Sequence, residues 1–410
     1  MVDVSVSLFT IAFIIALGFF ADLFFKRSRI PDVVWLILFG IIIGPVFKIV
    51  DREVLFEAAP LFTAIAIAII LFESGRKMRF RELLRDALST TIFMLANLVM
   101  STILVTVGVK FLFGLGWEIA LLLGVIVAGT SSAMIVTVVD RLGISLKVKT
   151  IMSVESVINS PFVIVVGLVL MDSLASPQNI FSFSTISSNI VKSFSVSIVS
   201  GVLIGIVWAR LLDYLQKDTY HHMMTISVLF LTYVLAQYLG GSGALAALAL
   251  GITLGNFSVF SKLFRKKIVV LTKETKDFNA MIAFVIRTFF FVFLGAVASL
   301  NDYRSIGIGL ILTMVTLVAR FVIVYPTVKI MKLERREMLT MGFMIPTGLS
   351  AAVLAVLPFT QYGIAGTESF VDIVFIVILA TTILATVGVG IVEYVYNKDG
   401  VKKRKNSVKS

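Results

Sequence analysis

The segment from Thr150 to Val166 carries polar side chains inside a stretch that is otherwise apolar enough to lie in a lipid bilayer. Glu155 and Asn159 are four residues apart and share one face of a helix, and Ser156 and Ser160 lie on the neighbouring stripe. Polar groups at membrane depth are costly, so they usually serve a function. We predict that this helix face offers oxygen ligands to an ion.

The composition is that of a polytopic membrane protein. Of the 410 residues, 59% are hydrophobic and 15% are charged, against about half and about a quarter in soluble proteins. There is no cysteine, and the only histidines are the adjacent His221 and His222, which disfavours a zinc site or a histidine-based triad. Neither a nucleophile–base pair nor a phosphate-binding glycine loop is evident. We expect a protein that is not an enzyme and uses no cofactor and no transition metal.

The hydrophobic segments predict an all-α bundle of about 13 transmembrane helices. The segments cover residues 4–22, 31–50, 58–74, 88–109, 117–138, 150–171, 191–212, 222–240, 243–259, 278–299, 305–328, 338–358 and 369–395. The first follows Asp3, with no basic residue before it and no cleavage motif after it, so we interpret it as a retained span rather than a signal peptide.

The basic residues predict the orientation of the chain. One side of the bundle holds most of the 36 Lys and Arg residues, whereas the other holds only five. These five are Lys48, Arg52, Lys110, Lys192 and Arg304. By the positive-inside rule, the N-terminus is outside and the basic tail 397–410 is in the cytoplasm, where it can contact anionic lipid. The net charge of +12 is then a topology signal that requires no nucleic-acid partner, and the composition suggests a prokaryotic cell membrane.

Two spans contain residues that can interrupt a helix in mid-membrane. These residues are Gly129, Thr130 and Ser131 in the fifth span and Pro346, Thr347 and Gly348 in the twelfth. Interruptions at matching positions of two halves predict a transporter built from inverted repeats. The repeats would be residues 1–172 and 218–396, with 173–217 as a connecting span. Alternatively, the small residues only allow close helix packing.

Four ionisable residues lie well inside the predicted spans, away from their ends, and they are Glu73, Glu155, Arg287 and Arg320. An isolated charge at the bilayer centre costs about 3 kcal/mol or more, so we expect pairing. We predict that Glu155 pairs with Arg320, with Arg287 at a helix end or as a second partner. Alternatively, each arginine forms a fixed structural salt bridge, and Glu73 is an interfacial residue beside a basic loop.

Several segments resemble the NhaP-like branch of the monovalent cation:proton antiporters. The similar segments are I-P-D-V-V-W-L-I-L-F-G-I-I-I-G-P in span 2, L-F-E-S-G in span 3, G-S-G-A-L-A-A-L-A-L-G-I-T-L-G-N in spans 8 and 9, and V-A-R-F-V-I-V-Y in span 11. The most specific is V-E-S-V-I-N-S, which is similar to the family motif E-S-x-x-N-D. The resemblance covers nearly the whole chain in the right order.

This resemblance implies a homodimer in which a scaffold faces a mobile core, with the fifth and twelfth spans crossing at the ion site. It implies that Glu155 pairs with Arg320 and that Asn159 matches the asparagine associated with electroneutral exchange. Glu73 and Ser156 match positions near the ion. Thr130 matches the threonine of the unwound fifth span, whose carbonyl or hydroxyl faces the cation.

The chain departs from the family pattern at three positions. Ser160 replaces the carboxylate that alternately binds cation and proton, Ser131 replaces the aspartate of a T-D pair, and Thr347 replaces the arginine of P-R-G. Losing opposite charges together keeps a buried site near electrical balance. Because serine cannot exchange a proton for a cation, Glu73 or Glu155 must titrate if exchange survives.

The leading hypothesis is a secondary transporter that exchanges a monovalent cation, Na+ first, for H+ across the cytoplasmic membrane. A second hypothesis is a transport-inactive sensor or scaffold of the same fold, motivated by the missing aspartate. A third is a transporter of altered substrate, such as K+ or an uncharged solute, since fewer carboxylates weaken the negative field of the pocket.

Overall fold

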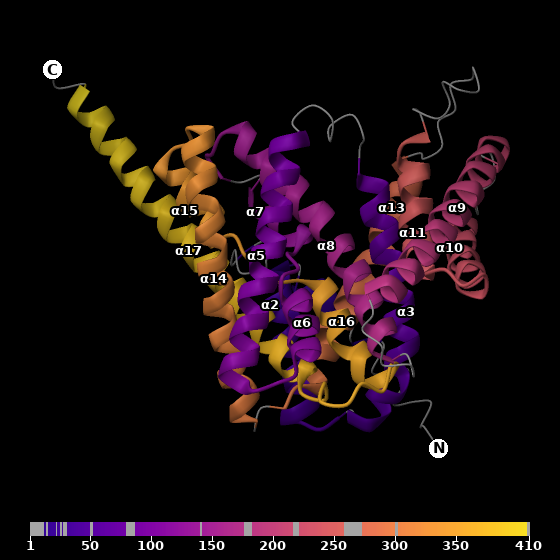
Figure 1. The fold of residues 1–410 in the computed structure, drawn as a ribbon. Coiled ribbons are helices and arrows are strands. Elements are labelled where there is room, and N and C mark those ends of the chain that lie inside the picture. The colour runs from indigo at the N-terminus through magenta and orange to yellow at the C-terminus, as the bar shows by residue number, and fades with distance from the viewer. Residues whose placement is uncertain are drawn as a thin grey trace.

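The computed structural model describes residues 12–407, except for 14, 22, 25–26, 28–30, 50–51, 79–86, 140–141, 176–182, 216–220, 258–272 and 300–301. The described residues form helices joined by short connections, and none of them forms a strand (Figure 1). The helices are α2 (Asp32–Ile41), continued by the π-helix η1 (Ile42–Val46), α3 (Arg52–Lys77), α5 (Ala87–Phe113), α6 (Trp117–Val127), α7 (Ser132–Val139), α8 (Leu146–Ala175), α9 (Phe183–Leu215), α10 (His221–Tyr238), α11 (Gly243–Gly255), α13 (Lys273–Val297), α14 (Tyr303–Met331), α15 (Arg335–Phe343), α16 (Leu349–Thr360) and α17 (Phe370–Ser407).

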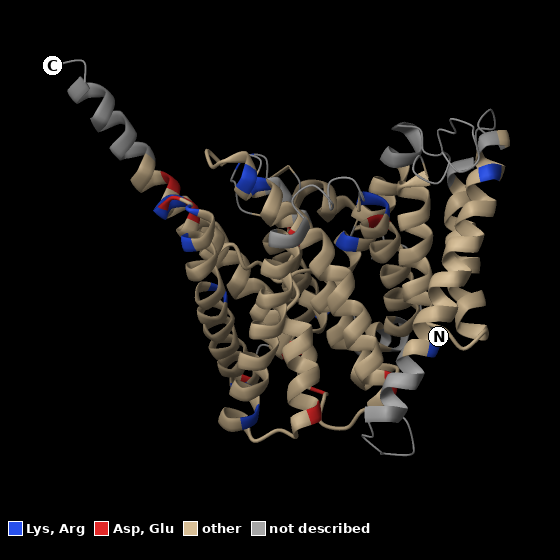
Figure 2. Ribbon diagram, turned by 45° about the horizontal axis from the view of Figure 1, so that its top comes forward, with Lys and Arg blue, Asp and Glu red and all other residues tan. Residues whose placement is uncertain are grey.

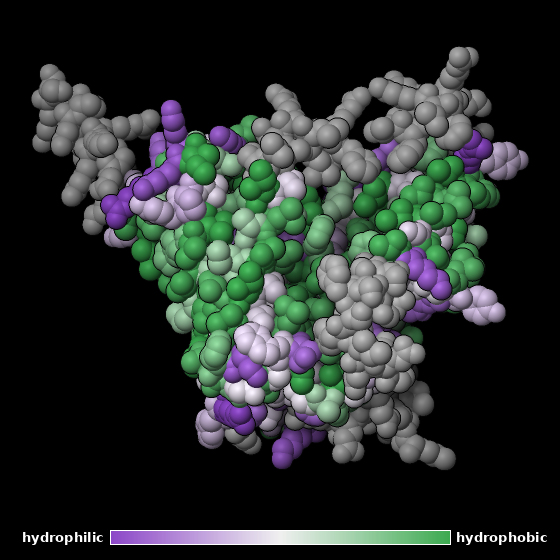
Figure 3. Space-filling model, viewed as in Figure 1, coloured by the Kyte–Doolittle hydropathy of each residue, from purple (hydrophilic) through white to green (hydrophobic). Residues whose placement is uncertain are grey.

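The distribution of apolar and charged residues fits a bilayer. Among the described residues, seven helices are long and apolar enough to cross a membrane, and five shorter apolar helices accompany them. The charged residues lie mostly near the two ends of the helices (Figure 2), and a wide apolar band covers the middle of the visible face (Figure 3). The predicted all-α membrane bundle is confirmed, whereas the number of thirteen spans stays a prediction.

The two interrupted helices occur where the sequence predicts them. The fifth span divides into α6 and α7 around residues 128–131, and the twelfth divides into α15 and α16 around residues 344–348. The breaks touch through the backbone, because the Ser131 amide donates a 2.7 Å hydrogen bond to the Pro346 carbonyl. A Cβ on Gly348 would lie only 2.6 Å from the Ser131 Cβ, so this crossing requires glycine.

Helix α3, which carries Glu73, is held closely against α11. A Cβ on Gly251 of α11 would clash with the Phe72 carbonyl of α3, and a Cβ on Gly75 would clash with the Leu248 carbonyl. Small residues of this kind let helix backbones approach each other in membranes. The contact fixes the depth of Glu73 in the bundle.

The last helix runs past the end of the last predicted span. The sequence predicts a span over 369–395, and the apolar part of α17 covers Phe370–Tyr396, while the helix itself continues without interruption to Ser407. Lysine and arginine have high helix propensity, so the basic segment extends the helix once the span has nucleated it.

Glu337, near the start of α15, ties two connections together. Its Oε1 accepts a 3.1 Å hydrogen bond from the Ser145 amide, and its Oε2 accepts a 3.0 Å bond from the Glu334 amide. Burial by itself raises the pKa of the Glu337 carboxyl, but hydrogen bonds from Ser145 and Glu334 and the charge of Lys147 together hold the pKa below its ordinary range. The carboxylate is therefore stabilised in the folded protein.

Replacing Glu337 by glutamine is expected to lower the free energy of unfolding by about 1–2 kcal/mol near neutral pH. Because the folded pKa is depressed, the stability that this carboxylate contributes is present above the unfolded pKa and is lost as pH falls through the folded pKa. Thermal unfolding in detergent checks this in a series from neutral pH to a pH below the folded pKa, since the wild type and the variant should converge only at that acidic end. A constant difference at every pH would contradict the assignment.

Candidate functional site

Glu155 and Arg320 form a buried ion pair between α8 and α14. Arg320 Nη2 donates to Glu155 Oε2 at 2.8 Å, and Nη1 donates to Oε1, while the exposed fractions of the two side chains are 1% and 0%. The structure therefore brings together the two charges that the sequence analysis paired. Both carboxylate oxygens accept hydrogen bonds from the guanidinium, so neither oxygen of Glu155 is free to bind another ligand in this arrangement.

Neighbouring groups complete this ion pair. Asn97 of α5 donates a 3.2 Å hydrogen bond to Glu155 Oε1, and Arg320 Nε donates a 3.0 Å bond to the Met341 carbonyl of α15. The guanidinium also lies over the Phe93 ring, 4.9 Å from its centroid. The pair thus joins α5, α8, α14 and α15 into one unit. Sequence analysis did not identify Asn97, whose signal was a lone amide in an apolar span.

The break between α6 and α7 is held by the polar face of α8. Asn159 Nδ2 donates to the Ala128 carbonyl at 3.3 Å and to Thr130 Oγ1 at 3.1 Å, and Ser160 Oγ donates to the Thr130 carbonyl at 2.9 Å. These bonds satisfy backbone groups that the interruption leaves without helical partners. Asn159 and Ser160, which are both predicted site residues, therefore hold the break in place through hydrogen bonds.

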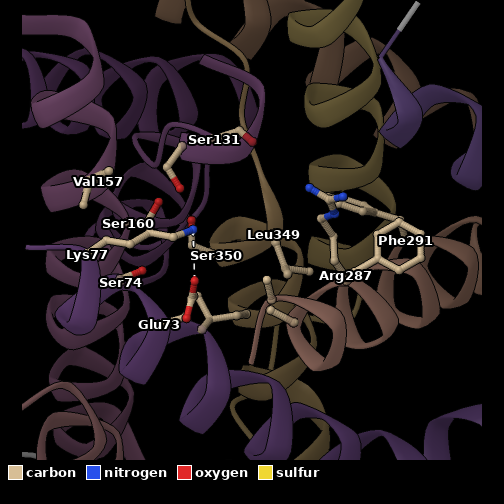
Figure 4. A pocket seen from close by; sticks show the side chains of 15 residues that line it. Glu73, Ser74, Lys77, Ser131, Val157, Ser160, Arg287, Phe291, Leu349 and Ser350 are labelled. Carbon is tan, nitrogen blue, oxygen red and sulfur yellow. Dashed lines mark ion pairs between the residues drawn. The ribbon is translucent and has the colours of Figure 1, made fainter. Parts of the chain in front are cut away.

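A cavity of about 200 Å³ lies beside the crossing and is bordered by α3, α7, α8, α13 and α16. Its polar and charged lining residues are Glu73, Ser74, Lys77, Ser131, Ser132, Ser160, Arg287 and Ser350. Figure 4 shows these side chains around the hollow, with Glu73 and Ser131 on opposite sides. Ser350 is buried, and within the described part of the chain its hydroxyl has no hydrogen-bond partner. The cavity thus offers one carboxylate and several hydroxyl oxygens.

Glu73 is paired within its own helix. Arg76 donates to its carboxylate through Nε at 2.9 Å and through Nη2 at 2.6 Å, and Lys77 Nζ lies 3.2 Å from Oε1. Glu73 is only 8% exposed and lines the cavity. It is a cavity carboxylate whose charge is already offset by Arg76.

The sequence analysis predicts Arg287 at a helix end or as a second partner of Glu155, or else in a structural salt bridge. It does not pair with Glu155, because Arg287 Nη2 lies 2.8 Å from Asp32 Oδ2 at the start of α2, and the two side chains are 24% and 18% exposed. Asp32 reaches Arg287 because α2 packs against α13. The Glu155 carboxylate is already bonded to Arg320 and Asn97. Sequence analysis did not identify Asp32, which follows Pro31 at the entrance to a span.

The remaining predicted residues separate into two groups. Ser131 lines the cavity, whereas Ser156 donates to the Ser153 carbonyl of its own helix and does not belong to the cavity lining. Thr347 lies in the second break, where its amide donates a 3.0 Å hydrogen bond to Thr381 Oγ1 of α17. Gly129 lies close to Ser350, because a Cβ there would be 3.2 Å from Ser350 Oγ. The expected ligand cluster on one face of α8 is therefore divided, since only Ser160 of that face reaches the cavity.

Two interrupted helices that cross in mid-bundle, beside a polar cavity, define a multi-pass membrane protein of the secondary-transporter class. A family model for the transmembrane part of sodium/hydrogen exchangers matches residues 9–392. The chain belongs to the sodium/hydrogen exchanger family, as the sequence resemblance predicted.

Individual relatives agree with this assignment. The chain is 24% identical over 361 residues to the low-affinity Na+/H+ antiporter NhaS1 of Synechocystis, covering 84% of this chain and 66% of that protein. It is 30% identical over 206 residues to the K+/H+ antiporter NhaP2 of Shewanella baltica, covering 49% of this chain and 35% of that protein. The chain therefore spans between about a third and two thirds of the length of these curated relatives.

A solved structure has the same fold. The sodium proton antiporter MjNhaP1 of Methanocaldococcus jannaschii, determined at pH 8, superposes with a TM-score of 0.78 at 23% sequence identity. The match covers 94% of this chain and 99% of that one.

Proposed function

We propose that the chain exchanges a monovalent cation, with Na+ as the first candidate, for H+ across the cytoplasmic membrane. The observation that supports this most is the cavity at the helix crossing, which combines the Glu73 carboxylate with hydroxyls of Ser131, Ser160 and Ser350. Hard cations prefer oxygen ligands, and transporters hold such ions at interrupted helices. Relatives named as Na+/H+ and K+/H+ antiporters support the same class of substrate, and K+ is the second candidate.

Glu73 is the proposed carrier of the exchanged charge. Exchange at one site needs a group that is negative when it holds the cation and neutral when it holds the proton. Glu155 has both oxygens engaged by Arg320, whereas Glu73 faces the cavity. We assign the proton and the cation to alternate occupancy of Glu73, with Ser160, Ser131 and the Thr130 backbone shaping the site.

The remaining parts of this proposal concern the whole assembly. We propose that the protein is a homodimer, that its N-terminus is outside and its basic C-terminal end is cytoplasmic, and that this end contacts membrane lipid. We also propose inverted repeats at 1–172 and 218–396. The support is that each of these two segments contains one interrupted helix and that the two interruptions contact each other.

A second candidate function is supported by the basic residues beside Glu73. Arg76 and Lys77 both contact the carboxylate, which weakens the field that attracts a free cation. In this second candidate function, the chain keeps the antiporter fold but acts as a sensor or scaffold without ion flux, or it transports an uncharged solute.

Glu73→Gln is expected to abolish cation-dependent proton movement, because glutamine holds neither charge. The purified protein is reconstituted in liposomes, a pH gradient is imposed, and internal pH is followed while Na+, Li+ or K+ is added outside. Glu118→Gln is the matched control, since Glu118 is an exposed carboxylate in the first turn of α6. Flux at the wild-type rate in Glu73→Gln would contradict the role of Glu73. If the folded wild-type protein shows no pH response to any of the three cations, the second candidate function is favoured.

A further inference from the structure

The side chain of Lys77 reaches into the cavity that Glu73 lines. It leaves the last turn of α3, and its Nζ lies 3.2 Å from Glu73 Oε1. Figure 4 shows the chain extended toward Glu73 across the hollow that also contains Ser160 and Ser350. Lysine at this position therefore places an ammonium group at the carboxylate of the proposed ion site.

The Lys77 charge is additional to what the carboxylate needs. Arg76 already engages Glu73 through two nitrogens, and its side chain is only 9% exposed. Arg287, the other basic lining residue, is paired with Asp32. Among the described lining residues, Lys77 is thus a basic residue whose acidic partner, Glu73, is already paired with Arg76.

The ammonium group has the chemistry of the substrate. It is a monovalent cation, and the acceptors that suit its three N–H groups are carboxylate and hydroxyl oxygens, which are the ligands of a dissolved monovalent cation as well. The Ser350 hydroxyl, which has no partner among the described residues, adds an unused acceptor to the same cavity.

We propose that the Lys77 ammonium occupies the cation position of this cavity and sets its affinity by competing with dissolved cations for Glu73. This inference rests on the proposed function and deepens it by naming a residue that determines affinity. Cation binding then requires Lys77 to leave.

Departure of Lys77 needs no unfolding and no proton transfer. The side chain is 59% exposed and flexible, so its ammonium can move into water while the helix stays in place. Because a half-exposed pair of this kind is weak, the competition should be moderate rather than blocking.

Lys77→Gln is therefore expected to lower the Na+ concentration for half-maximal exchange by about three- to tenfold. The Na+ concentration that gives half of the maximal thermal stabilisation should fall by a similar factor. Lys192→Gln is the matched control, because Lys192 is an exposed lysine on α9 and its loss removes the same charge without touching the cavity. All arms use equal ionic strength with choline chloride, so that general screening does not contribute.

A second measurement does not depend on transport. The rate at which an amine-reactive acylating reagent labels Lys77, read by mass spectrometry, should rise with NaCl relative to choline chloride, while labelling of Lys192 stays constant. If NaCl speeds Lys77 labelling but no ion flux is measured, the competition between Lys77 and Na+ is supported and the proposed exchange function is contradicted. Unchanged labelling, or a half-maximal Na+ concentration in Lys77→Gln equal to or above that of wild type, would overturn the inference whether or not the protein transports.

Discussion

Arg320→Gln is expected to destabilise the protein by about 3–5 kcal/mol, because it leaves the Glu155 carboxylate charged and unpaired in a region closed to water. The variant also removes the donor to the Met341 carbonyl and the cation over the Phe93 ring. Thermal unfolding in detergent and the yield of monodisperse protein by size-exclusion chromatography measure the loss. We expect the variant to lose most of its folded fraction.

Two comparisons separate the ion pair from a general effect of lost charge. Arg287→Gln removes the same group from the partly exposed pair with Asp32, so its cost should stay near or below about 1 kcal/mol. The double variant Glu155→Gln with Arg320→Gln should recover part of the loss, since it leaves no isolated charge. Equal effects of Arg320→Gln and Arg287→Gln would contradict the special position of the Glu155 pair.

Ser160→Asp is expected to make the stability of the protein depend on cations. Ser160 donates to the Thr130 carbonyl at 2.9 Å, and an aspartate at this position would turn a carboxylate toward that carbonyl. Without a cation, the repulsion and the lost hydrogen bond should cost about 1–3 kcal/mol. A bound cation would join the two groups, and at a hundred times its Kd it would restore about 2.7 kcal/mol.

The measurement is the melting temperature of Ser160→Asp against the concentration of Na+, Li+ and K+. The control is Ser156→Asp on the same helix, because Ser156 lies outside the cavity lining and no cation should rescue it. Destabilisation of Ser160→Asp that no cation reduces would count against an ion site at the Thr130 carbonyl.

Much of this arrangement could be predicted from the sequence because it depends on local chemistry. The two interruptions could be predicted from the types of residue they contain. The segments 129–131 and 346–348 are rich in Gly, Pro, Ser and Thr, which disfavour a continuous helix in mid-membrane. The Glu155 to Arg320 pairing followed from the cost of isolated charges in a bilayer, which leaves few partners to choose from.

The rest depends on neighbours that the sequence does not specify. The partner of Arg287 is Asp32, which comes from a helix more than two hundred positions earlier in the chain and looked like a span boundary. The position of Lys77 in the cavity lining, with its Nζ 3.2 Å from Glu73 Oε1, is a three-dimensional contact that the sequence does not single out. Periodicity also places Glu155, Ser156, Asn159 and Ser160 together, yet they have different partners. Glu155 pairs with Arg320 of α14, Ser156 bonds within its own helix, and Asn159 and Ser160 bond to the break between α6 and α7.

The hydrogen bond between the Ser131 amide and the Pro346 carbonyl has a consequence for how this family can diversify. Both atoms belong to the main chain, so substitution of the side chains at positions 131 and 347 leaves the bond available. The contact between the two helix breaks therefore does not depend on the side chains that surround it. During evolution, charged side chains in such a pocket can be replaced by hydroxyl side chains while the backbone contact between the breaks is kept. The same fold can then acquire a different ion preference or a sensor function without transport.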